Sequence, residues 1–265
     1  MKRTAFLTTA LVMAGGMATA QDAFDCLIDP SLVVEIGSAE AGIIQEVFVT
    51  RGDVVTKGQM VARLESAAEL AALDYARTRA TDTSAIDIAN ARIKLLESEV
   101  ARAESLGAKN LLPEAIVDEK RSEYEEATLN LRQVEFERGL ALLDQTRVEA
   151  QLARRVIYSP VDGLLITAMI GPGEYVFSDA PVAQIAQINP LHIEVFLPTS
   201  YYPSLEVGQY AVVSPAEPIG GDYLAEIIVI DKVFDAASDT FGLRLRLDNP
   251  ESEIPAGIDC KVVFD

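Results

Sequence analysis

The chain has 265 residues, of which 49% are hydrophobic, and this content excludes an intrinsically disordered protein. Tryptophan is absent and aromatic residues make up only 6%, so the core must be built from Val, Ile, Leu and Ala. Such a core suits small β-modules and Ala-rich helices better than a large enzyme. The formal net charge of −19 gives a surface that repels nucleic acid and argues against a nucleic-acid partner.

The first twenty residues have the pattern of a secretory signal peptide. Lys2 and Arg3 form a basic start, residues 5–17 form a short apolar run, and residues 18–20 (Ala-Thr-Ala) supply a cleavage site. This run is too short to cross a bilayer, which takes about 20 residues. We expect residues 1–20 to be removed on export and the mature chain to work outside the cytoplasm; an uncleaved membrane anchor is the alternative.

Cysteine and histidine are scarce in this chain. Two cysteines, Cys26 and Cys260, lie close to the two ends of the mature chain. In an oxidising compartment we expect them to form a disulfide, and two buried free thiols are the alternative. The single histidine, His192, lies in an alternating apolar run and is expected to face solvent from a strand. We therefore expect no metal site and no cofactor.

The most distinctive feature is a segment that occurs twice, 121 positions apart. Residues 42–64, GIIQEVFVTRGDVVTKGQMVARL, align without a gap on residues 163–185, GLLITAMIGPGEYVFSDAPVAQI. Each copy alternates short apolar runs, which predict strands, with tight turns. Neither copy can bury both faces of its strands alone, so we expect the two to pack around a pseudo-two-fold axis. The structural turns are expected at Gly42, Gly52, Gly58, Gly163 and Gly173.

The two copies resemble the halves of a biotinyl/lipoyl-type β-module. The resemblance rests on GxIxxVxVxxGDxVxKGQxxAxLE at residues 42–65 and on IYSPVDG at residues 157–163, which matches an I-x-[AS]-P-x-D-G entry. In the HlyD-like periplasmic adaptor family, also called membrane fusion proteins, this module is split by a helical hairpin. The resemblance implies the same division here, with the module formed by residues 38–65 and 156–188.

Between the two copies, residues 66–155 have a helical composition with almost no Gly or Pro. Apolar residues at a 3-4 spacing predict the two seams of a coiled coil. The first seam consists of Ala72, Tyr75, Ile86, Ala89, Ile93, Leu96, Val100 and Ala103. The second consists of Val117, Tyr124, Ala127, Leu131, Val134, Ala141, Val148 and Leu152. Looser packing is expected where polar residues interrupt the seams, at Arg79, Asp82, Arg138 and Gln145.

The two arms of this hairpin meet at residues 106–113, LGAKNLLP. Gly107 is expected to end the first helix, and Pro113 to lie in the first turn of the second. Each arm then has about 40 residues, or ~60 Å at a rise of about 1.5 Å per residue. The arms must be antiparallel because the chain returns to complete the β-module.

After the second copy the pattern returns to strands. Apolar runs predict five of them, separated by turns such as Asn249-Pro250, at residues 191–197, 210–213, 223–230, 240–247 and 258–264. Their order resembles the β-barrel of the adaptor family. A strand at residues 32–36, within an N-terminal segment 21–37, is expected to join this barrel.

The expected fold class is therefore an elongated α+β protein. It consists of the split biotinyl/lipoyl-like β-module, interrupted by a long antiparallel α-helical coiled-coil hairpin at residues 66–155. A small β-barrel follows at residues 189–265.

The resemblance also implies partners. Adaptors of this family contact an outer-membrane channel through an Arg-x3-Leu-x6-Ser pattern at the hairpin tip. This chain has Arg102 and Leu106 in the first two places and Pro113 where serine is usual. The family further implies a link to an inner-membrane transporter and self-association into a ring, usually a hexamer. The absence of an N-terminal membrane helix favours a resistance–nodulation–division transporter; an ATP-driven exporter or type I secretion system is the alternative.

The function we expect is that of a non-enzymatic adaptor in the periplasm of a Gram-negative bacterium, peripheral to the inner membrane. The competing class is a biotin or lipoate carrier, which presents a modifiable lysine on the hairpin between its half-modules. Here the helical insertion takes that place, and no lysine lies at the junctions 65–66 and 155–156. The sequence contains no evident nucleophile–base pair or phosphate-binding loop, so no catalytic residue is expected.

Overall fold

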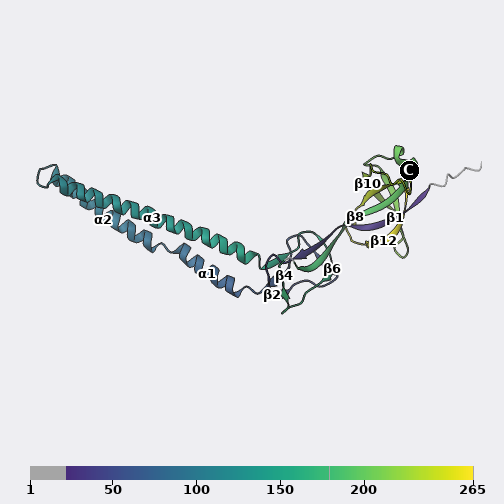
Figure 1. Ribbon diagram of the computed structural model, residues 1–265, viewed down its shortest axis with the longest axis horizontal. Coiled ribbons are helices and arrows are strands. Elements are labelled where there is room, and N and C mark those ends of the chain that lie inside the picture. The colour runs from purple at the N-terminus through teal and green to yellow at the C-terminus, as the bar shows by residue number, and fades with distance from the viewer. Residues whose placement is uncertain (1–21, 179, 265) are drawn as a thin grey trace, which may run out of the picture. The chain divides into compact units, whose positions relative to one another are not determined.

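The computed structural model describes residues 22–178 and 180–264, so the expected signal peptide at residues 1–20 lies outside the described residues. The chain forms two compact units. One consists of Val34–Ile185, and the other joins the N-terminal segment up to Val33 to Ala186–Asp265. In Figure 1 the first unit contains the helices and strands such as β2, β4 and β6, and the second contains strands such as β10 and β12.

The two sequence copies form the same strands in the same order. The first copy forms β2 (Gly42–Val47), β3 (Val54–Val55) and β4 (Met60–Leu64). The second forms β6 (Gly163–Ala168), β7 (Tyr175–Val176) and the start of β8 (Pro181–Pro198). Every strand of the second copy begins 121 positions after its counterpart, as the sequence alignment predicted.

Each copy lends its short middle strand to the other copy. Strand β2 pairs with β7, and the equivalent strand β6 pairs with β3. The Ile44 amide donates to the carbonyl oxygen of Glu174 at 2.8 Å, and the equivalent Leu165 amide donates to that of Asp53 at 2.9 Å. Strand β5 (Val156–Tyr158) extends one sheet to the order β5-β4-β2-β7. These duplicated contacts show the expected pseudo-two-fold relation between the copies.

The core of this module is built from equivalent positions of the two copies. The first copy buries Ile44, Val55, Val61, Ala62 and Leu64. The second copy buries the counterparts of these residues, which are Leu165, Val176, Val182, Ala183 and Ile185. The repeat is thus a repeat of core positions as well as of strands.

The glycines at equivalent positions of the two copies have two different structural roles. Gly52 and Gly173, at equivalent turns, have φ values of 95° and 87°, and Gly58 has φ of 84°. Residues with a Cβ atom rarely adopt this left-handed conformation. Gly42 and Gly163 instead begin strands β2 and β6, so the expectation that they lie in turns is wrong.

Arg155 ties both ends of the helical insertion to the module. Its Nη2 forms an ion pair with Oε1 of Glu69 at 2.5 Å, and its Nη1 donates to the carbonyl oxygen of Ala41 at 3.1 Å. A Cβ atom at Gly42 would lie 2.9 Å from the same Nη1. Glycine at the start of β2 therefore leaves room for the arginine that closes the base of the hairpin.

The insertion forms three helices rather than two: α1 (Ala67–Thr81), α2 (Ser84–Gly107) and α3 (Glu114–Ala153). Helix α3 runs beside both of the others (Figure 1). Its direction is opposite to theirs, because Lys120 pairs with Glu99 at 3.4 Å near one end and Glu149 pairs with Arg77 at 3.3 Å near the other. The hairpin is antiparallel, as predicted.

The first arm breaks at Asp82 and Thr83, which the sequence analysis did not predict. Oδ1 of Asp82 accepts hydrogen bonds from the amide and the hydroxyl of Ser84, at 2.9 and 2.5 Å, and so caps the start of α2. Nε of Arg138 donates to the carbonyl oxygen of Ala80 at 3.3 Å, near the end of α1. Two charged residues expected to loosen the seam are thus the residues that stabilise the break.

Burial agrees with the predicted seams in α2 and α3 but not in α1. The buried seam residues are Ala89, Leu96 and Ala103 in α2, and Val117, Ala127, Ala141 and Val148 in α3. In α1 the buried residues are Leu73, Ala76 and Ala80, whereas the predicted Ala72 and Tyr75 are exposed. The break interrupts the helical phase between α1 and α2, so the pattern of α2 cannot be extended into α1.

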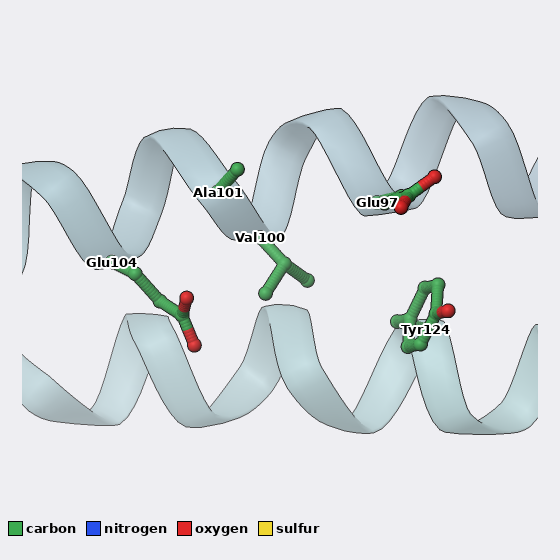
Figure 2. Close-up of a pocket in the computed structure, with 5 residues that line it drawn as sticks. All are labelled: Glu97, Val100, Ala101, Glu104 and Tyr124. Carbon is green, nitrogen blue, oxygen red and sulfur yellow. The ribbon is translucent and has the colours of Figure 1, made fainter.

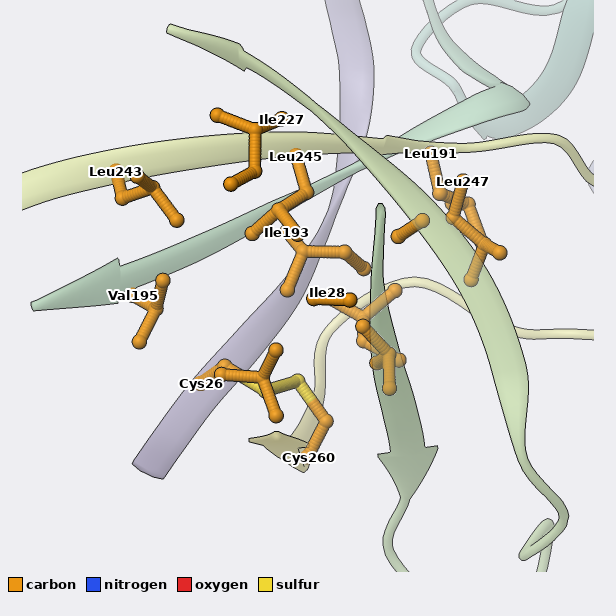
Figure 3. Packing of buried hydrophobic residues seen from close by; sticks show 14 of the residues in the cluster. Cys26, Ile28, Leu191, Ile193, Val195, Ile227, Leu243, Leu245, Leu247 and Cys260 are labelled. Carbon is orange, nitrogen blue, oxygen red and sulfur yellow. A yellow bond between two sulfur atoms is a disulfide. The ribbon is translucent and has the colours of Figure 1, made fainter. Parts of the chain in front are cut away.

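The second unit is a β-barrel with a mainly aliphatic core. Its neighbouring strands follow the order β1-β12-β9-β10-β11-β8, and an additional pairing between β1 and β8 closes the ring. The bounds are β1 (Ala23–Gly37), β9 (Tyr210–Pro215), β10 (Tyr223–Ile230), β11 (Thr240–Leu247) and β12 (Ile258–Phe264). A short 3-10 helix, η1 (Thr199–Ser204), follows β8. Figure 3 shows Ile28, Ile193 and Leu245 from three of these strands inside the core.

The N-terminal strand joins the barrel at other residues than expected. Residues 23–28 pair with β12, in a register that places Cys26 opposite Cys260. Val34 and Ile36 lie in the segment 32–36 that was expected to join the barrel, but they pack on the core of the split module. Strand β1 has 15 residues, which is long enough to contribute to both cores.

Candidate functional site

The tip of the hairpin is closed by an asparagine in the left-handed backbone conformation. The amide of Asn110 donates to the carbonyl oxygen of Gly107 at 2.8 Å, and that of Leu111 donates to Leu106 at 3.0 Å. With φ of 55° at Asn110, these bonds form a Schellman-type cap. Helix α2 ends at Gly107, as expected, but the residue in the left-handed conformation that closes the cap is Asn110, three positions later.

Gly107 allows close packing of the two arms instead. A Cβ atom at this position would lie 3.1 Å from Cγ2 of Val117 on α3, which is tighter than ordinary contact. Pro113 precedes the first residue of α3 and has φ of −61° and ψ of 141°, an extended conformation. It was expected inside the first turn and lies one position earlier, where its carbonyl oxygen accepts from the Ile116 amide at 3.0 Å.

The tip presents apolar side chains to solvent. Leu106 and Ile116 are exposed, and Leu111 is 69% exposed. Arg102 is also exposed and lies one turn from Leu106 on α2, where its Nε donates to a backbone carbonyl oxygen of the preceding turn at 3.3 Å. The structure brings Arg102 and Leu106 to one end of the hairpin, with Pro113 in the adjoining turn. Sequence reasoning missed Leu111 and Ile116, although leucine in a turn was a signal of an exposed contact.

A pocket of about 260 Å³ opens between α2 and α3 beside the tip, lined by Glu97, Val100, Ala101, Glu104 and Tyr124 (Figure 2). Val100 and Glu104 point from α2 toward α3, and Tyr124 rises from α3. Arg121 pairs with Glu104 at 2.8 Å and neutralises its charge. The pocket is thus a gap in side-chain packing with a paired carboxylate at its edge.

Cys26 and Cys260 form a disulfide bond within the barrel core (Figure 3). Both residues are buried, and they belong to the neighbouring strands β1 and β12. The bond therefore connects the first and last strands of the described chain.

The two junctions between module and hairpin lie side by side. Strand β4 ends at Leu64, whose amide donates to the carbonyl oxygen of Arg155 at 2.8 Å, just before β5 begins. Neither junction contains a lysine. Among the residues that the structure describes, no cluster of three or more His, Cys, Asp or Glu is arranged to bind a metal ion. Over the same residues, no helix is long and apolar enough to cross a membrane.

His192 lies on the outward face of β8, between the buried Leu191 and Ile193, and is half-buried. Partial burial lowers its pKa from the ordinary value of 6.5, and the nearby guanidinium of Arg244 lowers it further, against the opposing effect of Glu194. Since the pKa in the folded state is below that of the unfolded chain, the unfolded state binds more protons at pH values between the two pKa values. The contribution of His192 to stability is therefore lost as the pH falls below about 6.5.

We expect NMR titration of this single histidine to give a pKa below 6.5. Arg244→Gln should raise that pKa, because it removes a positive charge and frees the Glu194 carboxylate, which Arg244 binds at 2.5 Å. Arg147→Gln, the same change at an exposed position of α3, is the control and should leave this pKa unchanged. An unshifted pKa in the wild-type chain would contradict this interpretation.

A β-module assembled from two interleaved halves, with an antiparallel helical hairpin inserted between them and a β-barrel after them in the chain, is the architecture of membrane fusion proteins. Residues 32–187 match the family described as CzcB-like, barrel-sandwich hybrid domain. The match covers more than half of the chain, and the chain belongs to this family of membrane fusion proteins.

Solved structures share this fold at low sequence identity. MacA from Actinobacillus actinomycetemcomitans has a TM-score of 0.76 at 18% identity, covering 92% of this chain and 78% of that one. The membrane fusion protein Spr0693 from Streptococcus pneumoniae R6 has a TM-score of 0.59 at 15% identity, covering 92% and 98% of the two chains. Identity this low shows the fold alone.

Curated relatives match most of this chain. The nodulation protein NolF of Rhizobium meliloti (strain 1021) is 23% identical over 221 residues, which are 83% of this chain and 57% of NolF. The chain spans about half the length of the curated relatives it matches.

Proposed function

We propose that this protein is a non-enzymatic adaptor that links an inner-membrane transporter to an outer-membrane channel in the periplasm of a Gram-negative bacterium. The chain reaches that compartment by a signal peptide at residues 1–20 and stays peripheral to the inner membrane. Its copies assemble into a ring, with six as the expected number. Membership of the membrane fusion protein family supports the adaptor role.

One observation carries this proposal: the hairpin occupies the place where a carrier protein would present its modifiable lysine. The two junctions are hydrogen-bonded to each other, and Arg155 and Glu69 brace them. The module therefore serves as a rigid base for the hairpin. At the other end, the tip exposes Leu106, Leu111 and Ile116, which suits contact with another protein.

The transporter that we assign is of the resistance–nodulation–division type. The assignment of the transporter type is inferred from the amino-acid sequence. An ATP-driven exporter is the competing assignment, and the identity of the transporter that co-isolates with the chain decides between them.

The tip contact can be tested by photo-crosslinking in cells from a probe placed at Leu111, which is exposed at the turn. We expect crosslinks to an outer-membrane channel protein. Arg102→Asp should lower their yield by roughly tenfold, because it reverses a charge one turn from Leu106 in the contact. Arg51→Asp, the same reversal at an exposed turn of the β-module, should leave the yield unchanged. Equal yields from the Arg102→Asp and wild-type chains would count against tip binding.

A further inference from the structure

Helix α3 carries a second apolar row on the side opposite to its seam. Leu129, Phe136, Leu140 and Leu143 follow one another at spacings of 7, 4 and 3 residues, and all are more than half exposed. The seam residues of α3, such as Ala127 and Ala141, face the other arm and are buried. The outer row, which we call the α3 row, has the spacing of a coiled-coil seam without a helix against it in the part of the chain described here.

Helix α2 has a shorter exposed row of its own. Ile88 and Leu95 are seven residues apart and exposed, and they lie away from the buried Ala89 and Leu96 that face α3. The α3 row and this α2 row point away from each other across the hairpin. One copy of the chain therefore cannot cover one row with the other.

Charged residues flank both rows at matching heights. The ion pair between Lys120 and Glu99 places these two residues level with each other. Because both helices rise equally per residue, positions at equal distances from this pair on the two arms are also level. Five positions farther from the tip lie Glu125 on α3 and Lys94 on α2. Twelve positions farther lie Arg132 on α3 and Asp87 on α2.

These four charges have opposite signs at each height. Glu125 and Arg132 flank Leu129 on the outer side of α3. On α2, Asp87 directly precedes the exposed Ile88, and Lys94 directly precedes the exposed Leu95. All four are exposed, and within residues 22–178 and 180–264 none of them forms a salt bridge. A second hairpin placed alongside at the same height and direction would bring each charge to its opposite.

We propose that the α3 row binds the α2 row of the next copy, head to tail, with Glu125 against Lys94, Arg132 against Asp87 and Leu129 packed between them. This inference rests on the proposed ring and names the surfaces that form it. When two different surfaces bind each other, the first and last copies of a row each keep one surface free. Further copies can therefore be added until the rotation between neighbours closes a ring.

The competing arrangement is a two-fold contact between two α3 rows, antiparallel about Phe136. It would bring Glu125 near Arg147 but would leave Ile88 and Leu95 of α2 uncovered. It would also produce only dimers, since a two-fold contact uses the same surface on both copies.

Cysteine crosslinking of the full chain in cells separates these arrangements. We expect the double variant Lys94→Cys/Glu125→Cys, after mild oxidation, to give a ladder of species larger than a dimer on non-reducing gels. Each single variant should remain uncrosslinked, because residue 94 meets residue 125 and not itself. The native disulfide is buried and joins residues of one chain, so it does not form the ladder. Glu135→Cys in place of Glu125→Cys, at an exposed site of α3 outside the row, is the matched control.

Charge exchange provides an independent test in the same chain. Arg132→Asp or Asp87→Arg, added to the crosslinking variant, should each lower the yield of the ladder by roughly tenfold through like-charge repulsion. The combination Asp87→Arg/Arg132→Asp should restore it. Failure of the combination to restore the yield would overturn the pairing of these two residues.

The remaining outcomes are decisive as well. Dimers alone, with Phe136→Cys also forming dimers, would establish the two-fold contact and overturn the proposal, and so would uncrosslinked monomers. A ladder without a co-isolated transporter or channel would support this interface and refute the adaptor function. Co-isolated partners without a ladder would support the adaptor function and refute this interface.

Discussion

Removal of the disulfide by Cys26→Ala/Cys260→Ala should lower the free energy of unfolding of the barrel by about 2–5 kcal/mol. The two cysteines are separated by 234 positions, and a crosslink over so long a loop restricts the unfolded chain strongly. Both side chains are also buried among the aliphatic residues of the barrel (Figure 3), so their loss adds a packing defect.

Hydrogen exchange of peptides from β12 and β4 distinguishes a local effect from a general one. We expect faster exchange in β12, which bears Cys260, and little change in β4, which belongs to the other unit. Reductant should reproduce the effect in the wild-type chain and have no further effect on the variant. If β12 of the variant exchanges as slowly as β12 of the wild-type chain, the disulfide does not stabilise the barrel.

Ile44→Ala and Leu165→Ala should each destabilise the split module by about 2–5 kcal/mol, the usual range for a large aliphatic residue in a well-packed core. These residues occupy equivalent places in the two sequence copies and are 1% and 0% exposed. Because the pseudo-two-fold relation gives them equivalent surroundings, their effects should be similar. The double variant should depart from additivity, since both side chains belong to one core.

Ile43→Ala is the matched control, because Ile43 is the next residue of β2 and is 44% exposed. It should cost less than about 1 kcal/mol, as expected for a partly solvated side chain. Denaturant unfolding followed by hydrogen exchange in β4 measures all of these effects. A cost of Ile44→Ala no greater than that of Ile43→Ala would contradict the shared core.

The repeat made the split module predictable in detail. Strand order and strand boundaries depend on the period-two pattern and on turn glycines such as Gly52 and Gly173, and these are local properties of the sequence. The seams of α2 and α3 were predictable for the same reason, since Leu96 and Val148 are buried by a regular helical period.

The departures arose where a single polar side chain outweighed the periodic pattern. Asp82 caps α2 and breaks the first arm, and the sequence Asp-Thr-Ser at residues 82–84 contained that capping signal. Asn110, not Gly107, is the left-handed residue of the cap, and Gly107 instead allows close contact with Val117. Such choices depend on tertiary contacts, which a pattern within one helix does not contain.

The candidate site was only partly predictable. Arg102 and Leu106 were found because they match a family pattern, and Pro113 because it occupies the third place of that pattern, where serine is usual. The structure places all three at the tip. The exposure of Leu111 depends on the geometry of the turn around Asn110 and could not be obtained from spacing. The exposed apolar rows on α2 and α3 were missed because the exposure of residues such as Phe136 and Ile88 is known only once the packing of the seam is known.

The central claim is that the chain joins two membrane proteins, and affinity isolation of the exported chain after mild crosslinking in its native cells tests it most directly. The account predicts that an inner-membrane transporter and an outer-membrane channel are recovered together with the chain, and that the intact mass of the chain shows no biotin or lipoate. Recovery of neither membrane protein, or a mass increased by a prosthetic group, would contradict it.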